Sequence, residues 1–215
     1  MKDWISTAGM VIASMPMGEY DRRVLLLTDQ LGKISAFIKG SRRPGNSLLS
    51  AGRLFAFGRF ELYEGRSSYT VKGAEILDYH EFLSQDPQAL CYASYFGELA
   101  DYYGQEGATD PSLLKLLYWG IRSLKNPHLS RPLLRYVFEL KLMSVEGEAP
   151  PEPEGSLTES ARKAWQFVLQ SEIEKCFLFT LEPEDFRAFS REVAPLRRER
   201  MDRHFKSLEV LEQME

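Results

Sequence analysis

Basic side chains gather in one stretch of a chain that is acidic as a whole. Residues 22–72 hold ten Lys and Arg against three Asp and Glu, although the 215 residues together have a formal net charge of −4. Solubility needs only scattered charge, so this concentration indicates a polyanionic ligand, with nucleic acid the first to consider. The ten are Arg22, Arg23, Lys33, Lys39, Arg42, Arg43, Arg53, Arg59, Arg66 and Lys72.

The segment 33–39 places an aromatic ring between two cations. In an extended strand, alternate residues face the same side, so Lys33, Phe37 and Lys39 share one face and the apolar residues between them share the other. A ring that stacks on a base and cations that meet the flanking phosphates are what an unpaired nucleic-acid strand requires. Segment 53–63 repeats the pattern, and a bulge at Gly58 would reverse half of it.

We therefore predict a DNA-binding set of nine residues: Arg23, Lys33, Phe37, Lys39, Arg42, Arg43, Arg53, Arg59 and Lys72. For Phe37, Phe55 and Phe57, packing in a core or against a neighbouring domain stands open beside base stacking. No base-reading motif is evident, so binding is expected to depend on salt rather than on base sequence.

The elements that carry these side chains read as five short strands, at 6–14, 22–28, 33–39, 53–63 and 67–77. They are rich in β-branched and aromatic residues and are separated by segments rich in Gly, Pro, Asp and Ser. Five strands in about 75 residues favour the Greek-key barrel called the OB-fold. Residues 1–80 are predicted to form this domain.

Helical periodicity begins after residue 81. Helices are expected at 87–104, 111–125 and 131–146, because Asp-Pro pairs cap the first two and Ser130 precedes the third. An exposed Glu- and Pro-rich connector follows at 146–155, and then helices at 158–169, 173–179 and 184–205, the last kinked or split by Pro195. The fold class is therefore α+β, with an all-helical domain at 81–215.

The sequence offers nothing that favours an enzyme, a metal or a cofactor. Cys91 and Cys176 are too few for a disulfide framework or a four-thiolate zinc site, and we expect both to be buried. His80, His128 and His204 are widely spaced, and neither a phosphate-binding glycine loop nor a nucleophile elbow occurs. No run approaches the roughly 20 apolar residues of a membrane helix, so we expect a cytoplasmic protein.

A second, weaker basic segment lies near the end of the chain. Residues 191–206 contain six basic and three acidic side chains. Interspersed signs on a helix are typical of intrahelical pairing on a solvated face, and an auxiliary DNA contact is the alternative.

Motifs in a fixed order resemble the RecO recombination mediators of bacterial DNA repair. They are a glycine-led first strand, the turn 16–21, the strand 24–28, Gly-Lys-Ile-Ser-Ala-Phe-Ile-Lys-Gly-Ser-Arg-Arg at 32–43, Phe-Glu-Leu-Tyr at 60–63, Tyr-Ala-Ser-Tyr at 92–95, Phe-Glu-Leu-Lys-Leu at 138–142 and Lys-Ser-Leu at 206–208. Each is weak alone, and their order over nearly the whole chain carries the resemblance.

The resemblance implies an amino-terminal OB-fold, a helical carboxy-terminal domain and a non-catalytic role. Proteins of this family bind single- and double-stranded DNA, anneal complementary strands and act with RecR. They help to load RecA onto DNA coated by single-strand-binding protein, so the implied place of action is the bacterial nucleoid.

Contact with the acidic tail of the single-strand-binding protein is attributed in this family to the helical domain. In this chain a group with suitable spacing consists of Leu134, Arg135, Phe138 and Lys141, for which a core helix with a basic edge is the alternative. Many relatives carry a four-cysteine zinc module after the third helix, where this chain has the Glu- and Pro-rich connector, so no metal is expected there.

Two other functions remain compatible with the residues. The barrel's charge would also suit a protein-docking adaptor that meets an acidic partner, or an RNA-binding OB module.

Overall fold

The computed structural model describes residues 4–65 and 68–214. By their internal contacts the residues form two compact units. One contains the residues up to 85 with 97–114, and the other contains 86–96 with the residues from 115 onward. The domain boundary at residue 80 stays a prediction, and each unit is described here by itself.

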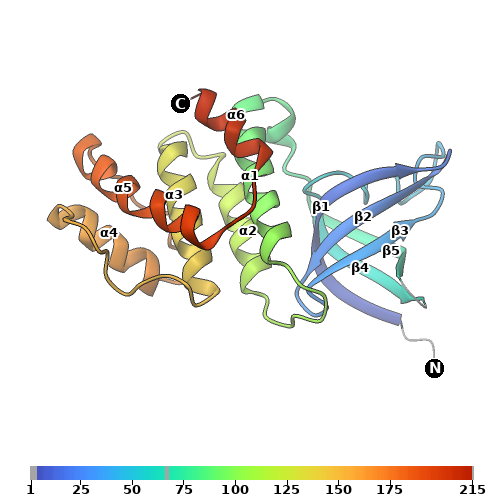
Figure 1. The fold of residues 1–215 in the computed structure, drawn as a ribbon. Coiled ribbons are helices and arrows are strands. Elements are labelled where there is room, and N and C mark those ends of the chain that lie inside the picture. The colour runs from blue at the N-terminus through green and yellow to red at the C-terminus, as the bar shows by residue number, and fades with distance from the viewer. Residues whose placement is uncertain (1–3, 66–67, 215) are drawn as a thin grey trace. The chain divides into compact units, whose positions relative to one another are not determined.

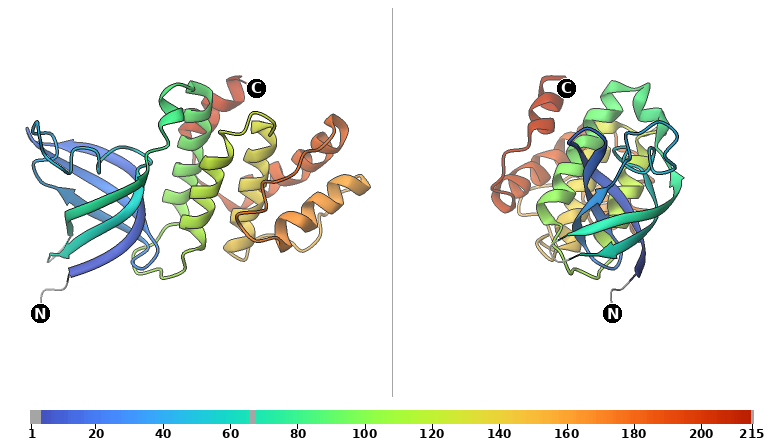
Figure 2. Two further views of the ribbon diagram at one scale, coloured as in Figure 1. Left: turned by 180° about the vertical axis from the view of Figure 1, so that it is seen from behind. Right: turned by 90° about the vertical axis from the view of Figure 1, so that its right-hand side faces the viewer.

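The first unit is built on a closed five-stranded barrel (Figures 1 and 2). Its strands are β1 (Trp4–Met17), β2 (Asp21–Thr28), β3 (Lys33–Ile38), β4 (Phe57–Glu64) and β5 (Tyr69–Asp78), in the order β1-β2-β3-β5-β4. This order and size confirm the predicted OB-fold. The predicted start of the fifth strand, at Ser67, lies outside the described residues.

The length of β1 closes the barrel. Its first half pairs antiparallel with β4, from Trp4 opposite Tyr63 to Met10 opposite Phe57, and its second half pairs with β2 as far as Met17 opposite Asp21. The remaining seam is a short parallel pairing of β3 with β5. Each of the five strands is therefore paired on both sides over at least part of its length.

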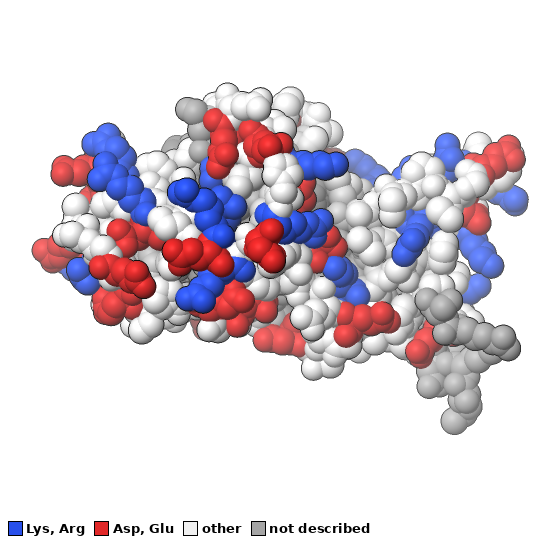
Figure 3. Space-filling view, in the orientation of Figure 1, with Lys and Arg blue, Asp and Glu red and all other residues white. Residues whose placement is uncertain are grey.

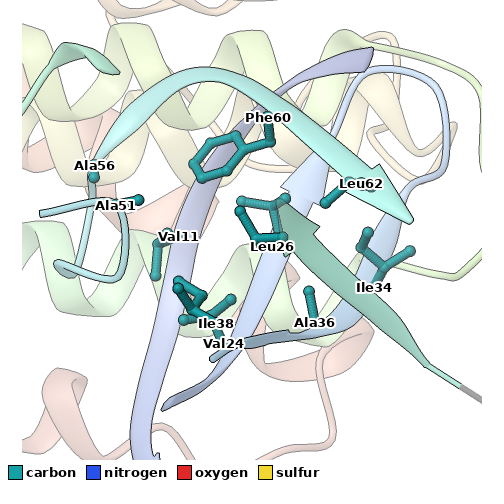
Figure 4. Packing of buried hydrophobic residues seen from close by; sticks show 11 residues of the cluster. Val11, Val24, Leu26, Ile34, Ala36, Ile38, Ala51, Ala56, Phe60 and Leu62 are labelled. Atoms are coloured by element: carbon teal, nitrogen blue, oxygen red, sulfur yellow. The ribbon is translucent and has the colours of Figure 1, made fainter. Parts of the chain in front are cut away.

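The barrel interior follows the alternation expected for strands. Val24 and Leu26 of β2, Ile34 of β3 and Phe60 and Leu62 of β4 are fully buried and point toward one another (Figure 4). The segment between β3 and β4 adds further apolar side chains to this cluster and closes one end of the barrel; they are Leu48, Ala51 and Ala56.

The fourth strand is shorter than predicted, because residues 53–56 turn into the barrel instead of extending β4. Phe55 has a left-handed φ of 62°, its amide donates to the Val11 carbonyl at 2.8 Å, and its side chain is buried. The predicted outward face is therefore wrong at Phe55, and the alternative of packing in a core applies, since its buried ring lies close to Gly97. The bulge expected at Gly58 is present as a register shift between Phe57 and Gly58.

The helices agree with most of the predicted ranges. They are α1 (Pro87–Tyr103), α2 (Ser112–Ser123), α3 (Arg131–Val145), α4 (Glu159–Gln170), α5 (Pro183–Arg200) and α6 (Lys206–Met214), with a 3-10 turn η1 at Glu81–Ser84. Residues 146–158 form neither helix nor strand. None of the described helices is long and apolar enough to cross a bilayer.

Two helix predictions were wrong. Residues 173–177 form turns and 178–179 are irregular; the Leu178 amide donates to the Lys175 carbonyl, and the Cys176 side chain is buried. The helix predicted to reach Phe205 ends at Arg200, and Pro195 lies inside it without ending it. Residues 201–205 then lead into α6, where Phe205 is buried.

Candidate nucleic-acid interface

The outer face of β2, β3 and β5 carries a row of side chains in direct register. Arg23 lies opposite Phe37 in the antiparallel pair, and Phe37 is aligned with Thr70 across the parallel seam. Register partners on neighbouring strands project to the same side, about 5 Å apart. The Arg23 guanidinium also donates to the Ser35 hydroxyl at 2.8 Å, which holds its charge over β3.

Two lysines extend this row in one direction. Lys39 follows Phe37 by two residues, Lys72 follows Thr70 by two, and both are exposed. Because β3 and β5 run parallel, both lysines lie on the same side of the row. Lys72 is the extra residue of a bulge, between Val71 opposite Leu62 and Gly73 opposite Glu61.

The turn between β1 and β2 brings two more arginines to this end of the barrel. The Arg42 amide donates to the Tyr20 carbonyl at 2.9 Å, and the Arg43 guanidinium lies 4.8 Å from the centre of the Tyr20 ring. Asp21 fixes the start of the loop that follows β3, since its carboxylate accepts from the Gly40 amide at 2.7 Å. Arg42 and Arg43 are both exposed.

We call this group the basic edge, and it consists of Arg23, Phe37, Lys39, Arg42, Arg43 and Lys72. Basic side chains predominate on the part of the barrel that is in view in Figure 3. A ring set among cations within one surface suits an unpaired strand, because bases stack on the ring while phosphates meet the charges.

Three other predicted residues make separate contacts. Lys33 is at the opposite end of β3, roughly 20 Å along the strand from Lys39, and its ammonium pairs with Asp101 at 2.9 Å. Arg59 faces Glu75 across the β4–β5 pairing, and the Arg53 guanidinium lies 5.1 Å from the centre of the Tyr79 ring. Arg66, one of the ten basic residues counted in the sequence, lies outside the described residues.

Sequence reasoning missed two aromatic residues beside the predicted site, Tyr20 and Trp4, although it placed Tyr63 on an outward strand face. Tyr20 is exposed under Arg43, and the hydrogen bond from Tyr20 to Glu19 raises the pKa of its phenol. Tyr63 continues the row beyond Thr70, and Trp4 meets its ring edge-on at 6.2 Å. Trp4 is 65% exposed. The sequence signal that could have pointed to this ring is a tryptophan at the start of the first strand.

The four residues predicted to meet a protein partner are all buried. Leu134, Arg135, Phe138 and Lys141 are at most 5% exposed. Arg135 donates to Glu139 at 3.2 Å, and the Lys141 ammonium donates to the carbonyls at the end of α4, at 2.7 Å from that of Ser171. In this arrangement the group forms core, and a partner does not reach it.

Burial also shifts the titration of this interior. It raises the pKa of the Glu139 carboxyl against the opposing effect of Arg135, and it raises the pKa of Tyr95, whose hydroxyl donates to Glu139 at 2.7 Å. It lowers the pKa of Lys141 and raises that of the Cys176 thiol to about 12. Among the described residues, no three His, Cys, Asp or Glu side chains gather as a metal site would require.

Two family models match most of the chain. The model described as recombination protein O N terminal matches residues 1–80, and the one described as recombination protein O C terminal matches residues 84–158. The chain belongs to the RecO family. The resemblance found in the sequence motifs is thereby confirmed.

Relatives named DNA repair protein RecO support the same conclusion. That of Alkaliphilus metalliredigens is 35% identical over 146 residues, which are 68% of this chain and 59% of the relative. That of Symbiobacterium thermophilum is 36% identical over 143 residues, 66% of this chain and 56% of the relative. The chain thus spans less than two thirds of the length of these RecO proteins, and α4, α5 and α6 lie beyond the residues that the family models match.

Proposed function

We propose that this RecO family chain is a mediator of DNA repair and homologous recombination that captures DNA on its barrel. The basic edge carries the proposal, since five exposed cations surround Phe37 on one end of an OB-fold. The names of the relatives support a role in DNA repair.

Capture of an unpaired strand follows from two separable contributions. Stacking on Phe37 contributes about 1 to 3 kcal/mol for one base, and each phosphate neutralised on a single strand adds about 0.7 to the slope of log affinity against log salt. With four phosphates met, the slope is about −3. Duplex DNA is expected to bind through the cations alone, because its bases are not available for stacking.

Annealing of complementary strands needs no catalysis in this scheme. The protein holds a strand by its backbone, and base pairing supplies the driving free energy, so neither nucleotide hydrolysis nor a cofactor is required. We further propose that the chain acts with RecR, and that it meets the acidic tail of the single-strand-binding protein and so helps to load RecA. The barrel and the acidic helical unit, which have opposite net charge, support a division between DNA and protein partners.

The test is a titration of fluorescently labelled single-stranded DNA at several salt concentrations. Neutralising part of the basic edge with Lys39→Gln, Arg42→Gln and Arg43→Gln removes three exposed cations. We expect the salt slope to become smaller by about 2, with a corresponding loss of affinity at low salt.

A matched control has the same charge change elsewhere. Arg162→Gln, Lys163→Gln and Lys175→Gln alter three exposed cations that are paired with Glu152, Glu159 and Glu172. This control should bind like the unaltered chain. No binding by the unaltered chain at low salt would favour the protein-docking adaptor, and preference for RNA over DNA of equal length would favour an RNA-binding module.

A further inference from the structure

Three arginines of α5 lie on one face of the helix. Arg187, Arg191 and Arg198 have the spacing i, i+4, i+11, which places them within about 40° of one another around the helix axis. All three are exposed, and we call them the arginine stripe. In Figure 3 the Lys and Arg side chains on the helical half of the molecule stand among Asp and Glu side chains.

Two of the four acidic residues of α5, Asp185 and Glu192, are turned toward the chain that precedes α4. The Asp185 carboxylate accepts from the Thr158 hydroxyl at 2.6 Å, and the Glu192 carboxylate accepts from the Gly155 amide at 2.8 Å. Both therefore lie on the side of the helix that holds residues 155–158. Glu184 and Glu199 are exposed, near the two ends of the helix.

The arginines of the stripe are not paired with carboxylates in the described part of the chain. Within the described ranges 4–65 and 68–214, none of its three guanidinium groups lies within 4.0 Å of a carboxylate. Exposed cations elsewhere in the same unit differ, since Arg162 pairs with Glu152 at 3.1 Å and Lys163 with Glu159 at 2.6 Å. Intrahelical pairing, the alternative considered from the sequence, does not account for these arginines.

The spacing and surroundings of the stripe indicate its ligand. With a rise of 1.5 Å per residue, the arginines stand about 6 and 10.5 Å apart along one line. Ala194 and Pro195 lie between them, and the nearby ring of Phe189 is fully buried. The stripe thus offers neither a ring for a base nor a pocket for an apolar side chain of a peptide, whereas arginine suits repeated phosphates.

We propose that the arginine stripe binds the phosphodiester backbone of duplex DNA, as a second nucleic-acid surface separate from the barrel. The excess of four basic over acidic residues between Arg187 and Lys206 adds to the attraction. Two surfaces let one chain hold two DNA segments at once and so favour their annealing, a consequence that rests on the proposed function.

The experiment compares duplex binding by three proteins over a series of salt concentrations. The variant Arg187→Gln, Arg191→Gln, Arg198→Gln is set against the unaltered chain and the control Arg162→Gln, Lys163→Gln, Lys175→Gln. We expect the stripe variant to lower the salt slope for duplex by about 2 to 3 and to bind more weakly at low salt. An unchanged slope, or an equal change in the control, would overturn the proposal.

The barrel and the stripe are distinguished by their substrates. The stripe variant should retain the affinity of the unaltered chain for a short single strand, which the basic edge binds. If instead the unaltered chain binds no single strand, the proposed function fails. The duplex comparison then still tests separately whether the arginine stripe binds duplex DNA. Annealing of two labelled strands should be slower with the stripe variant than with the control.

A second measurement needs no variant. Phenylglyoxal modifies accessible guanidinium groups, and mass spectrometry of the unaltered chain, with and without duplex, measures the protection of each arginine. Arg187, Arg191 and Arg198 should be protected, and Arg162 should react equally in both samples. Equal modification of the stripe with and without duplex under binding conditions would exclude it as the contact.

Discussion

Removing Arg135 tests whether the interior of α3 is core rather than a partner surface. The Glu139 carboxylate is fully buried and accepts from Arg135 at 3.2 Å and from the Tyr95 hydroxyl at 2.7 Å. The substitution Arg135→Met fills the space but leaves this carboxylate without its nearest cation. Breaking a buried pair in this way costs about 3 to 5 kcal/mol, and because Arg197 also acts on Glu139 we expect about 3.

The loss should depend on pH in a defined direction. Burial already raises the pKa of Glu139, and loss of Arg135 raises it further. The folded state then holds the proton more tightly than the unfolded chain, so stability falls as pH rises above the unfolded pKa, by at most about 1.4 kcal/mol per pH unit. The deficit of Arg135→Met should therefore be smallest at acidic pH.

Urea unfolding followed by tryptophan fluorescence measures this effect. The signal reports on the helical unit, because Trp165 is fully buried there while Trp4 is already exposed in the folded chain. Adding Glu139→Gln to Arg135→Met should restore part of the stability and remove the pH dependence. A loss below 1 kcal/mol, or a double variant as unstable as the single one at neutral pH, would refute the assignment of this group to the core.

Three further predictions concern the barrel and the buried thiol. Phe37→Ala should weaken single-strand binding about tenfold in a fluorescence titration while the salt slope stays the same, because no charge is removed; a changed slope would contradict stacking. Gly58→Val should destabilise the barrel by about 2 kcal/mol or more in urea unfolding, since a Cβ there would lie 2.1 Å from the Glu75 carbonyl; a loss under 1 kcal/mol would contradict the bulge. Burial raises the pKa of Cys176 to about 12, so a disulfide reagent at pH 8 should modify Cys91 first and Cys176 only after unfolding, and rapid reaction of both would show that Cys176 is accessible.

The barrel was predictable because its strands alternate visibly. In β3, Ile34, Ala36 and Ile38 are buried and the residues between them are not, as period-two spacing requires. Phe55 was not predictable, because its left-handed backbone is held by a hydrogen bond to Val11, far away in the chain. A local pattern contains no information about such a partner.

The candidate site shows the same limit. The sequence indicates which cations belong to the barrel, but not the contacts of Arg42 and Arg43 with Tyr20 that bring their loop to the turn between β1 and β2. Nor does it show that Lys33, at the far end of β3, is engaged in an ion pair with Asp101. The burial of Lys141 likewise depends on carbonyl groups about 30 residues later, so its charge suggested a surface where the structure has an interior.

The double pairing of β1 has a consequence for biosynthesis. Trp4 leaves the ribosome well before its strand partner Tyr63, and β5 ends only at Asp78. A nascent chain that has not reached Tyr63 therefore exposes hydrogen-bonding groups of β1 along an open side. The seam between β3 and β4 is filled only by β5, which ends at Asp78, so we expect the barrel to close only as the helical segments begin to emerge.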